Sequence, residues 1–192
     1  MKSVKGVLLL LALLALTACS TKTSYMSPLI EEPKMIQSDE SAIVFMRPSV
    51  FGGAIQAPIA EIKDDGLVFV AISSSGTRIL HKTTPGKHLY LVGGESAHLL
   101  EADLEAGMVY YVYVKAIRGL WKARFQFNPV TDLTDKSFRK DYIKCKWYTE
   151  NEKAEQWFQE NYKSLEYKTK TQLDKDKQAY LTSDLGINSL IF

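Results

Sequence analysis

Short apolar stretches separated by turn residues fill the chain from Ser41 to about Val130. Val, Ile, Tyr and Phe dominate these stretches, and such residues favour β-strands. The breaks between them supply turn chemistry, as in Asp64-Asp65-Gly66 and Thr84-Pro85-Gly86-Lys87. The predicted strands are Ala42–Arg47, Ile55–Ile62, Leu67–Ile72, Thr77–Lys82, Lys87–Val92, His98–Leu104, Val109–Ala116 and Trp121–Phe127. Their regular spacing indicates a sandwich or small barrel, and we expect a mainly β fold, an antiparallel β-sandwich of about 7–8 strands.

Alternation within the strands predicts which side chains face the core. One predicted core face holds Trp121, Ala123, Phe125 and Phe127, and a second holds Leu100, Ala102 and Leu104. The stretch Leu67–Ile72 is apolar throughout, which is typical of a strand covered on both faces. We expect the C-terminal part of the chain to supply that cover.

After Asn128-Pro129 the pattern changes to charged residues with scattered aromatics, which favours helix. The stretch from about Glu150 to Tyr180 contains no Gly or Pro. Its apolar residues at helical spacing are Ala154, Phe158, Tyr162, Leu165 and Leu173, with Trp157 beside them. Residues 131–192 are therefore predicted to form a helical C-terminal extension.

The N-terminus has the layout of an export signal peptide. Lys2 and Lys5 precede an unbroken apolar run from Val7 to Leu16. This run has 10 residues, whereas a helix needs roughly 20 to cross a bilayer. It therefore fits the core of a signal at residues 1–18 and does not fit a permanent membrane span.

The end of the signal, Leu16-Thr17-Ala18-Cys19, resembles the bacterial lipobox. That resemblance implies a diacylglycerol on the Cys19 sulfur, cleavage after Ala18, and a further acyl chain such as palmitate on the new amino group. Two or three chains anchor a protein stably, whereas one does not. The alternative is an ordinary secreted protein whose signal contains a cysteine. Residues 19–40, rich in Ser, Thr, Pro and charge, are predicted to be a flexible tether.

Ser20 and Thr21 follow the cysteine, without the aspartate that in enterobacterial lipoproteins marks inner-membrane retention. We therefore expect the periplasmic side of the outer membrane, with the inner membrane and the cell surface as alternatives. Without Lys2 and Lys5, the mature chain has 22 basic and 22 acidic residues. This balance gives no indication of a nucleic-acid partner.

Cys145, between Lys144 and Lys146, has two interpretations. Its basic neighbours would lower the pKa of an exposed thiol and make it reactive. A lone cysteine is more often a small buried side chain. Because Cys19 is consumed by the lipid, no internal disulfide is expected.

Histidines and tyrosines are the candidate ligand-binding residues. A two-residue turn at Pro85-Gly86 would place His81 and His88 on one face of a hairpin, roughly 7–8 Å apart. Two histidines alone make an incomplete metal site, so we expect neither a metal nor a cofactor. Tyr90, Tyr111 and Tyr113 are predicted to project from a sheet face on which aromatic rings could bind a partner, a glycan or a lipid. We favour the alternative that the C-terminal helix, with Trp157, Phe158 and Tyr162, covers that face, because an apolar helix face must be buried.

Several motifs between residues 42 and 130 resemble an uncharacterised family of small bacterial lipoproteins that share a domain of unknown function. The motifs are Met46-Arg47-Pro48-Ser49, Phe51-Gly52-Gly53-Ala54, Pro85-Gly86-Lys87-His88, Gly107 with Tyr110-Tyr111-Val112, and Gly119-Leu120-Trp121-Lys122-Ala123-Arg124-Phe125. The resemblance implies a β-sandwich-like domain of the cell envelope at residues 41–130. It supplies no activity and no catalytic residue.

The sequence as a whole favours a lipoprotein that acts through contacts with the membrane or an envelope protein. A Gly-x-Ser-x-Gly turn is absent from the sequence, and the double glycines match no phosphate-binding loop. We therefore expect no enzymatic activity. The enzyme alternative, hydrolytic or metal-dependent, requires a concave site that joins His81 or His88 to a carboxylate.

Overall fold

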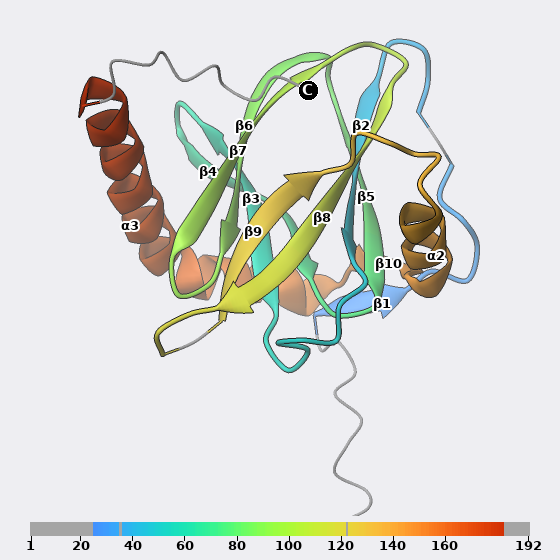
Figure 1. Ribbon diagram of the computed structural model, residues 1–192, viewed down its shortest axis with the longest axis horizontal. Coiled ribbons are helices and arrows are strands. Elements are labelled where there is room, and N and C mark those ends of the chain that lie inside the picture. Colours follow the sequence, from blue (N-terminus) through green and yellow to red (C-terminus); the bar gives the residue numbers. More distant parts are fainter. Residues whose placement is uncertain (1–24, 35, 122, 183–192) are drawn as a thin grey trace, which may run out of the picture.

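A computed structural model describes residues 25–34, 36–121 and 123–182, which form ten strands and two helices (Figure 1). The strands are β1 (Met26–Pro28), β2 (Ser41–Arg47), β3 (Ala57–Lys63), β4 (Gly66–Ser73), β5 (Thr77–Thr83), β6 (Gly86–Gly93), β7 (Ala97–Leu104), β8 (Val109–Arg118), β9 (Ala123–Pro129) and β10 (Lys146–Glu150). The helices are α2 (Lys136–Lys144) and α3 (Glu152–Thr182).

The strands form two sheets that pack face to face. One sheet has six strands in the order β1-β10-β5-β2-β8-β9, and the other has four in the order β4-β3-β6-β7. The pairs β2–β8 and β10–β5 are parallel, and the remaining pairs are antiparallel. The predicted mainly antiparallel β-sandwich with a C-terminal helix is confirmed, and all eight predicted strands are present.

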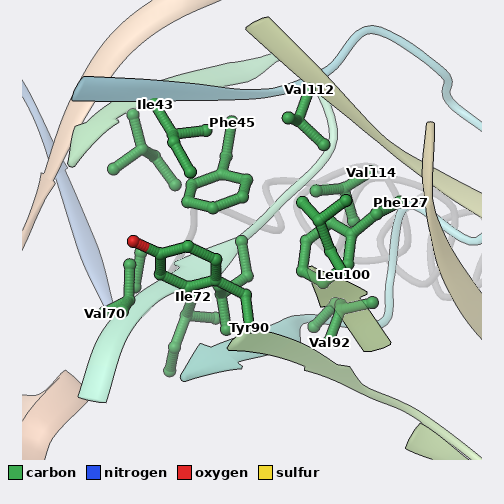
Figure 2. Packing of buried hydrophobic residues seen from close by; sticks show 14 of the residues in the cluster. Ile43, Phe45, Val70, Ile72, Tyr90, Val92, Leu100, Val112, Val114 and Phe127 are labelled. Carbon is green, nitrogen blue, oxygen red and sulfur yellow. The ribbon is translucent and has the colours of Figure 1, made fainter. Parts of the chain in front are cut away.

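Aromatic rings join the two sheets in the core. The Phe45 ring on β2 has its centroid 5.9 Å from that of Tyr90 on β6 and 5.6 Å from that of Phe127 on β9. Figure 2 shows Phe45 and Tyr90 meeting between the sheets. Leu100, Ala102 and Leu104, predicted to face the core, are buried on β7. Aromatic pairs such as Phe45 and Tyr90 stabilise the folded protein by more than the apolar area that they bury would give.

Helix α3 covers the outer face of the four-stranded sheet. Phe158 packs on Phe69 of β4 with ring centroids 5.1 Å apart, and the Leu67 N–H donates to the Tyr162 hydroxyl at 3.0 Å. The predicted cover of Leu67–Ile72 by the C-terminal region is thus confirmed. Because residues 158, 162 and 165 recur at helical spacing, one face of α3 meets the sheet.

Helix α2 packs on the outer face of the other sheet. Asp135 caps its N-terminus by accepting a hydrogen bond from the Ser137 N–H, and Phe138 is its buried residue. The Arg78 guanidinium lies 4.0 Å from the Tyr142 ring centroid and 4.4 Å from that of Trp147. These contacts join α2 to β5 and β10.

Two segment predictions need correction. Residues 19–40 were expected to be a flexible tether, but β1 lies within them and pairs with β10, and Met26 is buried. Residues 131–192 were expected to be helical, but β10 adds a strand to the six-stranded sheet. Each of these strands is only three to five residues long, too short for periodicity to reveal.

The prediction for Trp121 is also wrong. Ala123, Phe125 and Phe127 follow the expected alternation on β9, with both phenylalanines buried. The strand begins only at Ala123, however, and the side chain of Trp121 is 88% exposed. Alternation does not extend into the turn before the strand.

Candidate functional site

A pocket opens where two neighbouring strands of the four-stranded sheet separate. β3 and β6 pair only through Ile59–Val92, Ala60–Leu91 and Glu61–Tyr90. Beyond Glu61 the two strands diverge and leave a cavity of about 540 Å³, within the size range of small-molecule sites. The lining residues are Glu61, Ile62, Lys63, Asp64, Lys87, His88, Leu89, Glu101, Ala102 and Asp103.

A histidine–carboxylate pair forms the buried side of this fork pocket. His88 Nδ1 lies 2.7 Å from Glu61 Oε1, and the two side chains are 7% and 8% exposed. The other ring nitrogen, Nε2, lies 2.8 Å from the Thr84 carbonyl oxygen. Because a carbonyl only accepts, Nε2 carries a hydrogen and donates it. The Nδ1 contact to the Glu61 carboxyl group occupies the second ring nitrogen.

The fork pocket therefore joins His88 to a carboxylate in a concave site, the arrangement that the enzyme alternative required. Both His88 nitrogens are occupied, however, by Glu61 and by Thr84. The ten lining residues include no Ser, Thr, Cys or Tyr. Exposed charges of both signs, such as Lys63, Lys87 and Glu101, line the opening of the pocket.

The hairpin predicted for His81 and His88 is wrong. β5 belongs to the six-stranded sheet and β6 to the other, so the chain crosses between sheets at Thr84-Pro85. Both histidines nevertheless contact the Tyr90 ring. The ring centroid of His81 lies 5.6 Å away at an edge, and that of His88 lies 5.9 Å away in a stacked arrangement.

His81 is held neutral inside the sandwich. Burial lowers its pKa to about 4, against a partial opposing effect of Glu61. The unfolded chain takes up a proton near the ordinary value of 6.5, while the folded chain resists until about pH 4. The folded state therefore loses stability as the pH falls through this interval.

Between pH 6.5 and pH 4, we expect the free energy of unfolding to fall less in His81→Gln than in the native protein. At pH 4 the two decreases should differ by about 2–3 kcal/mol. Urea unfolding at several pH values measures this difference. Burial also lowers the pKa of His98. Because His98 is present in both proteins, its contribution to the pH dependence cancels in the comparison. Equal pH dependence in the two proteins would contradict the burial of His81.

The three tyrosines do not form the predicted aromatic face. Tyr90 is fully buried in the core. Tyr111 lies beneath α2, with ring centroids 5.2 Å from Phe138 and 6.0 Å from Tyr142, and burial raises its pKa. Tyr113 is half-buried, and burial raises its pKa to about 12. The favoured interpretation, cover by the C-terminal helix that carries Phe158 and Tyr162, is also wrong, because α2 covers Tyr111 whereas α3 lies on the four-stranded sheet.

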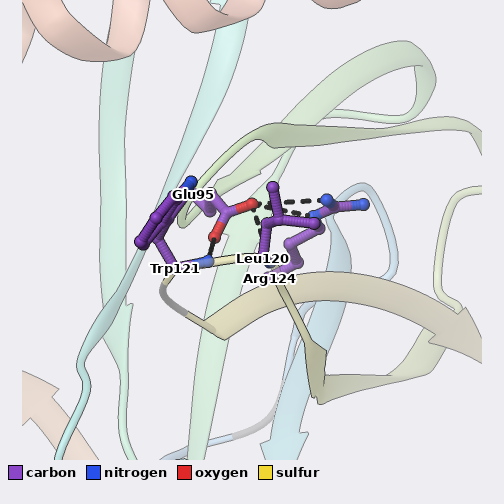
Figure 3. A network of polar contacts seen from close by, with 4 residues as sticks. All are labelled: Glu95, Leu120, Trp121 and Arg124. Carbon is purple, nitrogen blue, oxygen red and sulfur yellow. Dashed lines mark hydrogen bonds and ion pairs between the residues drawn. The ribbon is translucent and has the colours of Figure 1, made fainter.

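Sequence reasoning missed a polar network that holds the turn between β8 and β9. Figure 3 shows the Glu95 carboxylate accepting from the backbone N–H groups of Leu120 and Trp121, at 3.1 and 2.8 Å. Arg124 donates to the same carboxylate at 3.3 Å. In turn, the Glu95 N–H donates to the Ala123 carbonyl at 3.1 Å. Bonds to a charged acceptor are the stronger ones, so this turn is firmly held.

A buried arginine holds the neighbouring loop between β2 and β3. Arg47 is 0% exposed and donates to the carbonyls of Gly52, Ile55 and Ser73 at 2.6, 2.8 and 3.2 Å. Its guanidinium lies over the Phe125 ring at 4.6 Å. Burial lowers its pKa to about 10, which still leaves the side chain charged at neutral pH.

The structure also places Cys145 and the candidate metal ligands of the described residues. The Cys145 side chain is 1% exposed, and burial raises its pKa to about 11, which is the opposite of a reactive thiol. Across residues 25–182, as far as the structure describes them, three or more His, Cys, Asp or Glu side chains nowhere gather as metal ligands.

The described residues define a two-sheet β-sandwich with a charged pocket in a fork of one sheet and two firmly held loops at an end. No protein-family model, curated protein or solved structure matches this chain.

Proposed function

We propose that this chain is a lipoprotein of the bacterial cell envelope, anchored through acyl chains on Cys19 to the periplasmic side of the outer membrane. The observation that carries the proposal is the order of basic residues, a 10-residue apolar run and Leu16-Thr17-Ala18-Cys19. Cys19 and the signal lie outside the described residues. Within those residues, no helix is long and apolar enough to cross a membrane.

The anchored domain acts as a binding and interaction module and not as an enzyme. The fork pocket supports binding because charges of both signs line a cavity of suitable size. It lacks an aromatic platform for sugars, since Tyr90 is in the core. A zwitterionic molecule, such as a short peptide with free termini, matches the paired signs best.

A fatty-acid label tests the anchor. We expect cells fed a clickable palmitate analogue to label the native protein, and Cys19→Ala to abolish the label completely, because the thioether forms only on that sulfur. Cys145→Ala is the matched control and keeps full labelling, since that thiol is buried in the folded domain. Equal labelling of the native and Cys19→Ala proteins would defeat the anchor.

NMR of the His88 ring tests the pocket. Adding a dipeptide with free termini is expected to shift the His88 imidazole signals in a saturable way, and to leave those of His98, on β7, unmoved. Glu61→Gln is expected to weaken this binding at least about tenfold, as loss of one charge partner does. If the His88 signals of the native protein do not shift, the fork pocket does not bind the dipeptide and this part of the proposal is contradicted.

A further inference from the structure

We propose that two loops at one end of the sandwich form a surface that docks into the lipid interface of the membrane holding the anchor. This inference rests on the lipid anchor proposed above. We call this the tip surface: residues 49–55, between β2 and β3, and residues 117–121, at the end of β8.

The tip surface exposes large apolar side chains that a folded domain normally buries. Val50 is 77% exposed and Phe51 51%, while Leu120 is 78% and Trp121 88% exposed. Ile55 and Ile117, from the same two loops, are also exposed. Scattered apolar residues are ordinary on a surface, but a group of this kind marks an interaction site.

The two loops are neighbours in space. Gly52, with a left-handed φ of 66°, comes so close to β8 that an added Cβ would lie 3.2 Å from the Ala116 Cβ. The same atom would lie 3.8 Å from the Ala123 Cβ at the start of β9. A side chain at residue 52 would push the loops apart, so glycine allows them to form one surface.

Both loops are held rigidly while their apolar residues point to solvent. Glu95 fixes the backbone of Leu120 and Trp121, and Arg47 fixes that of Gly52 and Ile55. A rigid loop loses little conformational entropy when its side chains enter another phase. The exposed Trp121 can therefore insert into a lipid interface at little cost in conformational entropy.

The chain that leads to the anchor reaches this same end. Five residues lie between Cys19 and Tyr25, the first described residue, and a fully extended chain over these six steps spans only about 20 Å. In the view of Figure 1, the start of β1, the loop after β2 and the end of β8 all lie toward the lower end of the sandwich. A short connection there keeps the tip surface close to the lipid.

Composition favours lipid as the occupant over a protein partner. Tryptophan prefers the membrane interface, where its ring is apolar and its N–H is hydrated. Of the described basic residues in 47–56 and 115–124, Arg47 is buried and Arg124 pairs with Glu95, whereas Lys115 and Arg118 are exposed. Exposed basic residues such as Arg118 suit anionic headgroups, each contributing up to about 1 kcal/mol near such a surface.

Bromolipid quenching of the lipidated full chain tests the proposal. The protein is reconstituted into phosphatidylethanolamine–phosphatidylglycerol vesicles whose acyl chains carry bromine near the headgroup. The chain has three tryptophans, of which Trp147 is buried and Trp157 packs against the core. We expect strong quenching in the native protein and loss of most of it in Trp121→Ala.

Two further variants make the result specific. Leu120→Ser keeps all tryptophans and is expected to reduce the quenching of Trp121 at least twofold by lifting the loop. Ile143→Ser changes a residue of α2 that is 80% exposed and is expected to change nothing. Vesicle flotation is recorded for each sample. A native protein that floats but is not quenched through Trp121 overturns the tip surface and leaves the anchor standing, whereas failure to float overturns the anchor itself.

Discussion

Arg47→Leu is expected to lower the free energy of unfolding by about 3 kcal/mol. The guanidinium supplies hydrogen bonds to three carbonyls, those of Gly52, Ile55 and Ser73. A buried acceptor that loses its donor costs about 1–3 kcal/mol. Part of this loss is offset, because leucine avoids the cost of burying a charge and because water reaches the two loop carbonyls.

Urea unfolding measures the effect of this replacement. Arg47→Lys keeps the charge but cannot bridge three acceptors, so we expect it to recover less than half of the loss. Arg118→Leu, at an exposed position of β8, is the matched control and should change stability by less than about 0.5 kcal/mol. Similar losses from Arg47→Leu and Arg118→Leu would contradict the structural role of Arg47.

Phe158→Ala is expected to cost about 3–4 kcal/mol, since truncating a buried phenylalanine removes transfer free energy and leaves a cavity. The ring is 1% exposed and packs on Phe69. Because few side chains of α3 are as deeply buried, we expect the helix to separate from the sheet before the sandwich unfolds.

Hydrogen exchange across α3 separates this outcome from global unfolding. In Phe158→Ala, the helix amides are expected to exchange much faster than those of β2 and β8. Tyr167→Ala truncates an aromatic side chain of the same helix that is 73% exposed, and it should leave both rates unchanged. If amide exchange accelerates equally in α3 and in all strands, α3 unfolds together with the sandwich, which would contradict the expected separate opening of the helix.

The sandwich was predictable because its strands are long enough to alternate. Val112 and Val114 face the core while Tyr111 and Tyr113 face the other way, as the period of two requires. α3 was predictable because it is long and its apolar residues recur with the helical period of about 3.6 residues. β1 and β10 were not, since their pairing depends on partners far along the chain.

The candidate sites were less predictable because they depend on the third dimension. Thr84-Pro85-Gly86 suits a hairpin turn and a crossing between sheets equally well, and only the packing of β5 and β6 decides. The Glu61–His88 contact spans 27 positions and forms where two strands separate. The motifs around Arg47 and Gly119 were visible in the sequence, but nothing there assigned them to adjacent loops.

The tip surface and the fork pocket lie toward opposite ends of the same strand. β3 begins at Ala57, directly after the loop that carries Val50 and Phe51, and ends at Lys63 beside the pocket. Docking of the tip surface would therefore leave the pocket directed away from the membrane. If the proposed anchor and docking hold, a module with this orientation would keep its pocket accessible to soluble ligands.

The mass of the mature protein tests the central claim most directly. Protein purified from its native membrane is digested, and the N-terminal peptide is analysed by mass spectrometry. The lipid anchor predicts a chain that begins at Cys19, with a diacylglyceryl thioether on sulfur and an acyl group on nitrogen. A chain that begins at Met1, or a free thiol at residue 19, would contradict it.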